Sequence, residues 1–180
     1  MNLPNKLTVL RMILVPVFMA VLLLWNQWVA LAVFIVASLT DFVDGKIARA
    51  RGLVTNFGKF MDPLADKLLV ISAMVVFVEL GRMPAWVCMV VIARELAVSG
   101  LRMVAASNGV VMAAGWSGKI KTACTMVGLC VMMVPTVANI ALAGSFTINV
   151  LMWIIILVTT VVSGVEYFMK NGAVLVKEKI

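Results

Sequence analysis

The sequence contains no histidine, and charged residues make up only 13% of its 180 residues. The absence of histidine excludes catalysis by an imidazole group and metal sites that depend on histidine ligands. Cys88, Cys124 and Cys130 lie in apolar runs without a Cys-x-x-Cys spacing, so they indicate neither a thiolate metal site nor a disulfide framework. Soluble domains are about one quarter charged, and we therefore do not expect a soluble enzyme.

Apolar residues are abundant instead, since 64% of the chain is hydrophobic. A chain of this size cannot bury so much apolar surface in a globular core. A helix of about 20 residues crosses a hydrocarbon core about 30 Å thick, and apolar stretches of that length recur along the chain. They predict six transmembrane helices near residues 7–25, 28–50, 58–80, 84–107, 117–138 and 146–170. No linker or repeat divides the chain, so we expect an all-α integral membrane protein with a single domain over residues 1–180.

The basic residues, which give the chain a net charge of +7, gather on one side of these predicted helices. That side has Lys6, Lys46, Arg49, Arg51, Lys59, Arg102, Lys119, Lys121, Lys170, Lys177 and Lys179, whereas the other side has Arg82. The positive-inside rule places the basic side and both termini in the cytoplasm. The positive charge indicates anionic membrane lipids, rather than nucleic acid, as partners.

The polar residues also lie toward the cytoplasmic end of helices that run in opposite directions. Asp44 follows the apolar part of one predicted helix, Asp62 precedes the apolar part of the next, and Arg94 follows that of a third. This distribution predicts a polar cavity that faces the cytoplasm and is closed by an apolar layer. Snorkelling to the interface is an alternative for the lysines, but aspartate is too short to reach far.

All four aspartates fall between residues 41 and 66, in the pattern D-x2-D-G-x2-A-R-x8-G-x3-D-x3-D. At about 100° per residue, Asp41 and Asp44 share one helix face, and Asp62 and Asp66 share a face of the next helix. Ionised carboxylates at the hydrocarbon boundary repel one another, and cations relieve the repulsion. Hard oxygen ligands from two helices suit one or two divalent ions such as Mg²⁺ or Mn²⁺. A salt-bridge network and a proton relay remain alternatives.

This pattern resembles the signature of the CDP-alcohol phosphotransferase family. Every position of the signature is filled, by Asp41, Asp44, Gly45, Ala48, Arg49, Gly58, Asp62 and Asp66. Outside it, PNKLTVLRMILVPVF (4–18), MDPLADKLLV (61–70), IARELAVSGLR (92–102) and GKIKT (118–122) are similar to bacterial members of the family that use sn-glycerol 3-phosphate. The resemblance covers essentially the whole chain and agrees with six helices.

The resemblance implies transfer of a phosphatidyl group from CDP-diacylglycerol to sn-glycerol 3-phosphate, with release of CMP, by a homodimer in the bacterial inner membrane. It implies that two metal ions, Mg²⁺ or Mn²⁺, are held by Asp41, Asp44, Asp62 and Asp66. It also implies that Asp66 is the general base. The CDP portion of the donor is expected at Asn5, Thr8, Arg11, Gly45, Ala48, Arg49 and Gly58.

The acceptor carries its own phosphate, and binding it requires a second set of cations. The candidates are Arg94, Arg102, Lys119 and Lys121, because arginine makes bidentate contacts with phosphate and lysine supplies a point charge. An ion pair with Glu95 is the structural alternative for Arg94, and membrane topology alone is the alternative for the other three. Inositol phosphate or serine as acceptor also remains open. A divalent-cation transporter is a more distant alternative. Transport would not require the Asp-Gly-x2-Ala-Arg residues that are present in this sequence.

Overall fold

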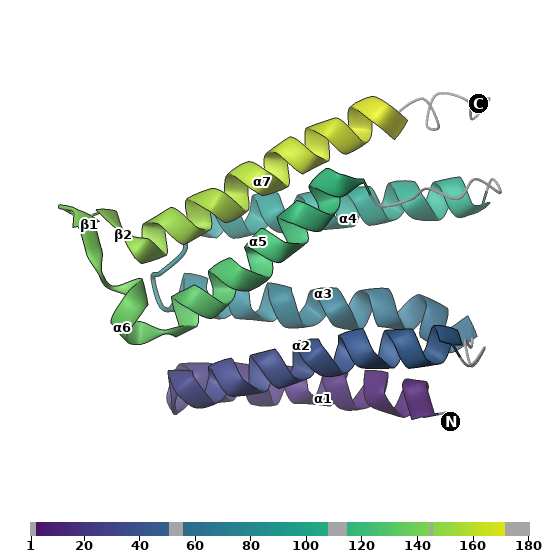
Figure 1. Ribbon diagram of the computed structural model, residues 1–180, viewed down its shortest axis with the longest axis horizontal. Coiled ribbons are helices and arrows are strands. Elements are labelled where there is room, and N and C mark those ends of the chain that lie inside the picture. Colours follow the sequence, from purple (N-terminus) through teal and green to yellow (C-terminus); the bar gives the residue numbers. More distant parts are fainter. Residues whose placement is uncertain (1–2, 51–55, 108–114, 145, 172–180) are drawn as a thin grey trace.

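The computed structural model describes residues 3–50, 56–107, 115–144 and 146–171; for residues 3–8, 41–50, 56–63, 66 and 107 it describes the helical backbone but not the side chains. Six long helices, a one-turn helix and a short hairpin make up these ranges (Figure 1). They are α1 (Leu3–Leu24), α2 (Gln27–Ala50), α3 (Asn56–Glu79), α4 (Ala85–Ser107), α5 (Trp116–Met133), α6 (Pro135–Ala138), β1 (Ala141–Ala143), β2 (Phe146–Thr147) and α7 (Ile148–Asn171).

Successive long helices run in opposite directions. The starts of α1, α3 and α5 and the ends of α2, α4 and α7 lie toward one end of the bundle, on the right in Figure 1. We call this the basic end, because Arg102, Lys119 and Lys170 lie near these helix termini. The turns after α1 and α3 lie at the opposite end with α6 and the β1–β2 hairpin, and we call it the hairpin end.

The predicted helices differ from the observed ones in two places where proline matters. α1 begins at Leu3 rather than near residue 7 and includes Pro4 in its first turn, where the missing N–H would have no helical partner anyway. The helix predicted for 117–138 ends at Met133, because Pro135 cannot donate the next helical hydrogen bond. Val134 N–H donates to the Val131 carbonyl at 3.1 Å, and Pro135–Ala138 form the separate turn α6.

The start of the last helix was also predicted too early. Phe146 pairs with Ala143 in the antiparallel β1–β2 hairpin, and α7 begins at Ile148. Gly144 has a φ of +53°, a conformation that glycine adopts without strain. The α3–α4 turn is closed similarly by Gly81, with a φ of +66°, and there the Arg82 N–H donates to the Phe77 carbonyl at 2.8 Å.

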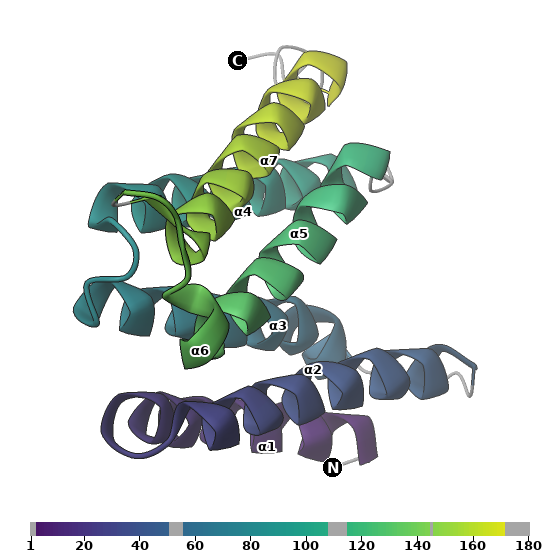
Figure 2. The ribbon, with the colours of Figure 1, turned by 60° about the vertical axis from the view of Figure 1, so that its left-hand side comes forward.

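The helices form two groups that meet along α3–α4, α2–α5 and α3–α5 contacts. α1 packs on α2 and α3, while α7 packs on α4 and α5 (Figure 2). The fully buried apolar side chains lie mostly toward the hairpin end and include Phe18, Phe34, Phe77, Met132 and Ile156. A Cβ at Gly128 on α5 would lie 3.0 Å from Cδ1 of Ile156 on α7, so the absence of a side chain there allows these two helices to approach closely. The apolar layer therefore lies on the hairpin side of the polar residues described below.

A separate polar group joins the helices at the hairpin end. Arg82 Nη1 donates to Gln27 Oε1 at 3.1 Å and to the Met132 carbonyl at 3.3 Å. Asn149 Nδ2 at the start of α7 donates to the Arg82 carbonyl at 2.6 Å. Arg82 thus links α2, α5 and α7 and is far along the helices from the other cations.

Among the described residues, α7 alone is both long and apolar enough, by length and composition, to cross a membrane. Shorter apolar helical stretches cover Val9–Leu24 and Gln27–Thr40. Large apolar side chains are exposed on the helices, including Leu24 at 85% and Met169 at 81%. The mainly helical fold and these exposed apolar side chains are consistent with a helical membrane protein.

Candidate active site

The four signature aspartates lie on helical backbone toward the basic end. Asp41 and Asp44 belong to the second half of α2, and Asp62 and Asp66 to the first half of α3. Because α2 and α3 are consecutive antiparallel helices, both pairs lie toward the same end of the bundle (Figure 1). Their side chains lie outside the described residues, so the ligand set stays a prediction. Among the side chains that the structure does describe, no three His, Cys, Asp or Glu residues gather to hold a metal ion.

The residues predicted to bind the CDP portion of the donor are distributed over the same part of the fold. The helical backbone includes Asn5 and Thr8 in α1, Gly45, Ala48 and Arg49 in α2, and Gly58 in α3, all outside the residues with described side chains. Arg11 on α1 is described and is buried, with 5% of its surface exposed. Since α1 packs on both α2 and α3, these helices adjoin one another, but donor contacts are not tested by the backbone alone.

A cavity of about 600 Å³ lies among α3, α4, α5 and α7. All the residues predicted to bind the acceptor phosphate line it, namely Arg94, Arg102, Lys119 and Lys121. Lys67, which directly follows the signature residue Asp66 on α3, contributes a further cation. Glu95 is the one acidic side chain among the described residues of the wall. The cavity therefore carries a clear excess of positive charge, which suits an anionic ligand.

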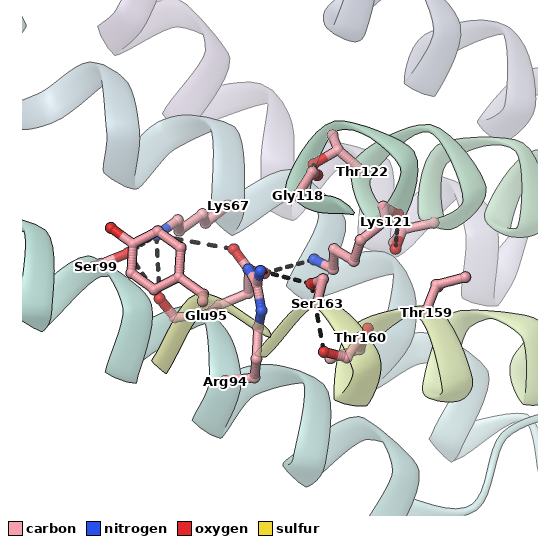
Figure 3. A network of polar contacts seen from close by, with 12 residues as sticks. Lys67, Arg94, Glu95, Ser99, Gly118, Lys121, Thr122, Thr159, Thr160 and Ser163 are labelled. Carbon is pink, nitrogen blue, oxygen red and sulfur yellow. Dashed lines mark hydrogen bonds and ion pairs between the residues drawn. The ribbon is translucent and has the colours of Figure 1, made fainter. Parts of the chain in front are cut away.

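Glu95 lies at the centre of the polar contacts in this wall (Figure 3). Its Oε1 accepts hydrogen bonds from Arg94 Nη1 at 2.9 Å and from Lys121 Nζ at 2.5 Å. Lys67 Nζ lies 3.9 Å from Glu95 Oε2 and donates to the Glu95 carbonyl at 3.3 Å. Lys67 also donates to the Ser99 hydroxyl. One carboxylate thereby joins cations from α3, α4 and α5.

Arg94 is held between α4 and α7. Its Nη2 donates to Ser163 Oγ at 2.7 Å, while its Nη1 pairs with Glu95. The Arg94 side chain is 13% exposed, and its Nε is buried without a hydrogen-bond partner among the described residues. The ion pair considered as a structural alternative is thus present, and Arg94 also lines the cavity. The two roles are compatible, because a guanidinium group has five N–H donors.

Two further cations of the cavity contact aromatic rings. Arg102 Nε donates to the Tyr167 hydroxyl at 3.3 Å, and its guanidinium carbon lies 5.6 Å from the centre of that ring. Lys119 Nζ lies 5.0 Å from the centre of the Trp116 ring. Cation–π contacts of this kind hold a cation in place and leave N–H groups available for other partners.

Sequence reasoning missed several residues of this wall. Lys67 is not among the residues predicted for the acceptor site, although its position directly after Asp66 is a usable signal. Ser163 and Tyr167 lie in the long apolar run of the last helix, and no local pattern distinguishes them there. Their contribution depends on α7 packing against α4, which only the fold provides.

Comparison with known proteins agrees with this arrangement. Residues 1–174 match the family described as CDP-alcohol phosphatidyltransferase. The chain is 43% identical over 185 residues to a protein of Bacillus subtilis (strain 168), covering 94% of this chain and 95% of that one. It is 42% identical over 136 residues to a protein of Escherichia coli (strain K12), covering 71% of this chain and 74% of the other.

A protein of Rickettsia felis (strain ATCC VR-1525 / URRWXCal2) is 33% identical over 170 residues, with 93% of each chain covered. All three relatives are named CDP-diacylglycerol–glycerol-3-phosphate 3-phosphatidyltransferase. Both the family match and the identities extend over most of the chain, including the signature helices and the cavity helices. The chain therefore belongs to the CDP-alcohol phosphatidyltransferase family.

Proposed function

We propose that this chain transfers the phosphatidyl group of CDP-diacylglycerol to sn-glycerol 3-phosphate, giving phosphatidylglycerophosphate and CMP. The relatives named above carry the name of this reaction. The observation that carries the proposal is the strongly basic cavity beside α3, the helix that bears Asp62 and Asp66. A phosphorylated acceptor needs such cations, whereas an uncharged alcohol does not.

The cavity is well suited to the phosphate of the acceptor. Arg94, Arg102 and Lys121 come from helices that pack around the same space, and all three line it. A charge-assisted hydrogen bond contributes about 1.5–3 kcal/mol, and more than one such bond to a single phosphate gives useful affinity and orientation. We assign the acceptor phosphate to Arg94, Arg102, Lys119 and Lys121, with Lys67 as an additional member.

The donor is proposed to lie at the signature on α2 and α3. Its residues offer carboxylate oxygens at i, i+3 and i, i+4 positions of two adjoining helices, a donor set that fits Mg²⁺ or Mn²⁺. Asp41, Asp44, Asp62 and Asp66 would hold two ions. Such ions neutralise the charge of the pyrophosphate and stabilise CMP as the leaving group. Arg49 and Arg11 are proposed to contact the phosphates of the donor.

In the proposed reaction Asp66 accepts the proton of the acceptor hydroxyl group. The acceptor oxygen forms a bond to the phosphorus of the phosphatidyl group, and the bond from that phosphorus to the CMP oxygen breaks. CMP leaves with the electron pair of that bond. Asp66 precedes Lys67 in α3, and Lys67 lines the cavity, so the helix that bears the proposed base also borders the proposed acceptor site.

We further propose that the six long helices all cross the bacterial inner membrane, with the basic end in the cytoplasm. The alternating helix directions support this topology, as does the concentration of lysine and arginine toward the basic end. Both termini are then cytoplasmic, on the side where water-soluble glycerol phosphate is available. A single domain over residues 1–180 that assembles as a homodimer completes the proposal.

The test is an acceptor panel with the detergent-purified protein and CDP-diacylglycerol. We expect CMP release with sn-glycerol 3-phosphate and little with glycerol, serine or inositol phosphate. Release should require Mg²⁺ or Mn²⁺ and stop when the metal is chelated. Preference for another acceptor would contradict the glycerol-phosphate assignment, and CMP release without any acceptor dependence would contradict transfer altogether.

A further inference from the structure

We propose that Glu95 is a positioning residue for the acceptor: its carboxylate holds the charged groups of Arg94 and Lys121 in the arrangement that receives the acceptor phosphate. The proposal rests on the proposed function, because it assigns a part of the same cavity. It adds that the single acidic side chain among the described wall residues improves, rather than weakens, binding of an anion.

The geometry supports this role because one oxygen serves two cations from different helices. Glu95 Oε1 accepts from Arg94 Nη1 at 2.9 Å and from Lys121 Nζ at 2.5 Å. Arg94 lies on α4 and Lys121 on α5. The shared oxygen fixes the position of one cation relative to the other, which neither backbone could do alone because both side chains are long and flexible.

Burial makes these contacts effective. The side chains of Arg94, Glu95 and Lys121 are 13%, 16% and 6% exposed, so the ion pairs are only weakly screened by solvent. Without the carboxylate, the two cations would repel each other, and Lys121 would be free to turn away. Glu95 therefore stabilises the site in the absence of the acceptor and keeps the site organised for its arrival.

Further contacts join this group to the neighbouring helices. Ser163 Oγ on α7 accepts from Arg94 Nη2 at 2.7 Å. Lys67 Nζ on α3 lies 3.9 Å from the second Glu95 oxygen, Oε2. The Glu95 carboxylate is thus connected, directly or through Arg94, to every helix around the cavity (Figure 3).

A simple counter-charge is the competing explanation, and it predicts a different pattern of KM changes. If Glu95 only reduced the positive charge, Glu95→Gln would make the cavity more positive and lower the KM for glycerol 3-phosphate. Glu95→Asp, which keeps the charge but shortens the side chain, would then change little. If Glu95 positions the cations, both substitutions should raise this KM, because either one disturbs the shared hydrogen bonds.

We expect Glu95→Gln and Glu95→Asp each to raise the KM for sn-glycerol 3-phosphate about tenfold, which corresponds to the loss of one charge-assisted hydrogen bond. The KM for CDP-diacylglycerol should change less than about twofold, which is a smaller effect than the loss of one such hydrogen bond would cause. Glu166→Gln is the matched control, since Glu166 pairs with Lys170 on α7 and lies outside the described wall of the cavity. It should leave both KM values unchanged.

A double-mutant cycle tests whether Glu95 acts through Lys121. We expect the combined Glu95→Gln and Lys121→Gln protein to have a lower KM for the acceptor than the product of the two single-variant KM increases predicts. The reason is that the second substitution removes a contact that the first has already broken. Fully multiplicative effects would show that the two residues act independently and would overturn the proposal.

The remaining outcomes are also decisive. An unchanged or lowered KM for glycerol 3-phosphate in both Glu95 variants would overturn the positioning role while leaving the proposed function intact. If neither variant folds, Glu95 is required for the fold rather than for positioning, which also overturns it. If the unaltered protein does not use glycerol 3-phosphate, the proposed function itself fails, and the positioning role falls with it.

Discussion

Gly164 on α7 lies directly against the side chain of Arg94 on α4. A Cβ at position 164 would lie 3.1 Å from Arg94 Cγ, which is tighter than ordinary van der Waals contact. The Ser163 hydroxyl, on the preceding residue, accepts from Arg94 Nη2 at 2.7 Å. Two consecutive small residues of α7 thus receive the aliphatic part and the guanidinium group of one arginine, which directs that group into the cavity.

Replacing Gly164 with alanine should therefore weaken acceptor binding. The added methyl group would displace the Arg94 side chain by a few tenths of an ångström and strain its hydrogen bonds, so we expect the KM for glycerol 3-phosphate to rise about three- to tenfold. Gly100→Ala on α4 is the matched control, because its Cβ would meet nothing within 4 Å. Steady-state kinetics that show the same KM for both variants would contradict this contact as the cause.

Arg94→Gln and Arg102→Gln should each raise the KM for glycerol 3-phosphate about 10- to 100-fold, because each removes charge-assisted contacts with the acceptor phosphate. The KM for CDP-diacylglycerol should change much less. Arg49→Gln should have the converse effect, since Arg49 lies in the donor signature. Arg82→Gln, at the hairpin end, should alter stability but neither KM. Equal effects of Arg94→Gln on both substrates would indicate a structural role.

Asp41→Asn, Asp44→Asn and Asp62→Asn should each abolish turnover while leaving a folded protein in the membrane. Asparagine keeps the shape of aspartate but removes the charge that a divalent ion requires. The measurement is CMP release at limiting Mg²⁺, with thermal unfolding as the control for folding. A folded variant with near-normal activity would remove that residue from the proposed ligand set.

The proposed topology predicts which turns are accessible from outside the cell. In a protein without Cys88, Cys124 and Cys130, a cysteine in the Gly81–Pro84 turn should react with an impermeant thiol reagent added to intact spheroplasts. A cysteine at position 108 or 171 should react only after the membrane is opened. The reverse labelling pattern would mean that the basic end faces outward, away from the cytoplasmic substrates.

The sequence allowed most of the long helices to be predicted, because apolar runs and the turn residues around Gly81 specify them locally. The end of α5 was predicted incorrectly, because the apolar run continues to Ala138 whereas Pro135 ends the helix at Met133. The β1–β2 hairpin was missed because its strands are short and Phe146 also fits an apolar helix. Such errors concern the hairpin end and leave the candidate site unaffected.

The site itself was predicted in part. The phosphorylated acceptor that the family resemblance implies led to the prediction of Arg94, Arg102, Lys119 and Lys121, and the fold brings all of them to one cavity. The role of Glu95 as the shared partner of Arg94 and Lys121 could not be read from the sequence, because the contact depends on how α4 packs beside α5. The hydrogen bond from Arg94 to Ser163 could not be predicted for the same reason, since it crosses the α4–α7 interface.

The most direct test of the central claim is identification of the lipid product. Purified protein would be incubated with CDP-diacylglycerol, Mg²⁺ and isotopically labelled sn-glycerol 3-phosphate, and the lipids analysed by mass spectrometry alongside CMP. We predict labelled phosphatidylglycerophosphate in an amount equal to the CMP released. CMP formed without labelled lipid, or a labelled lipid that lacks the acceptor phosphate, would contradict phosphatidyl transfer to glycerol 3-phosphate.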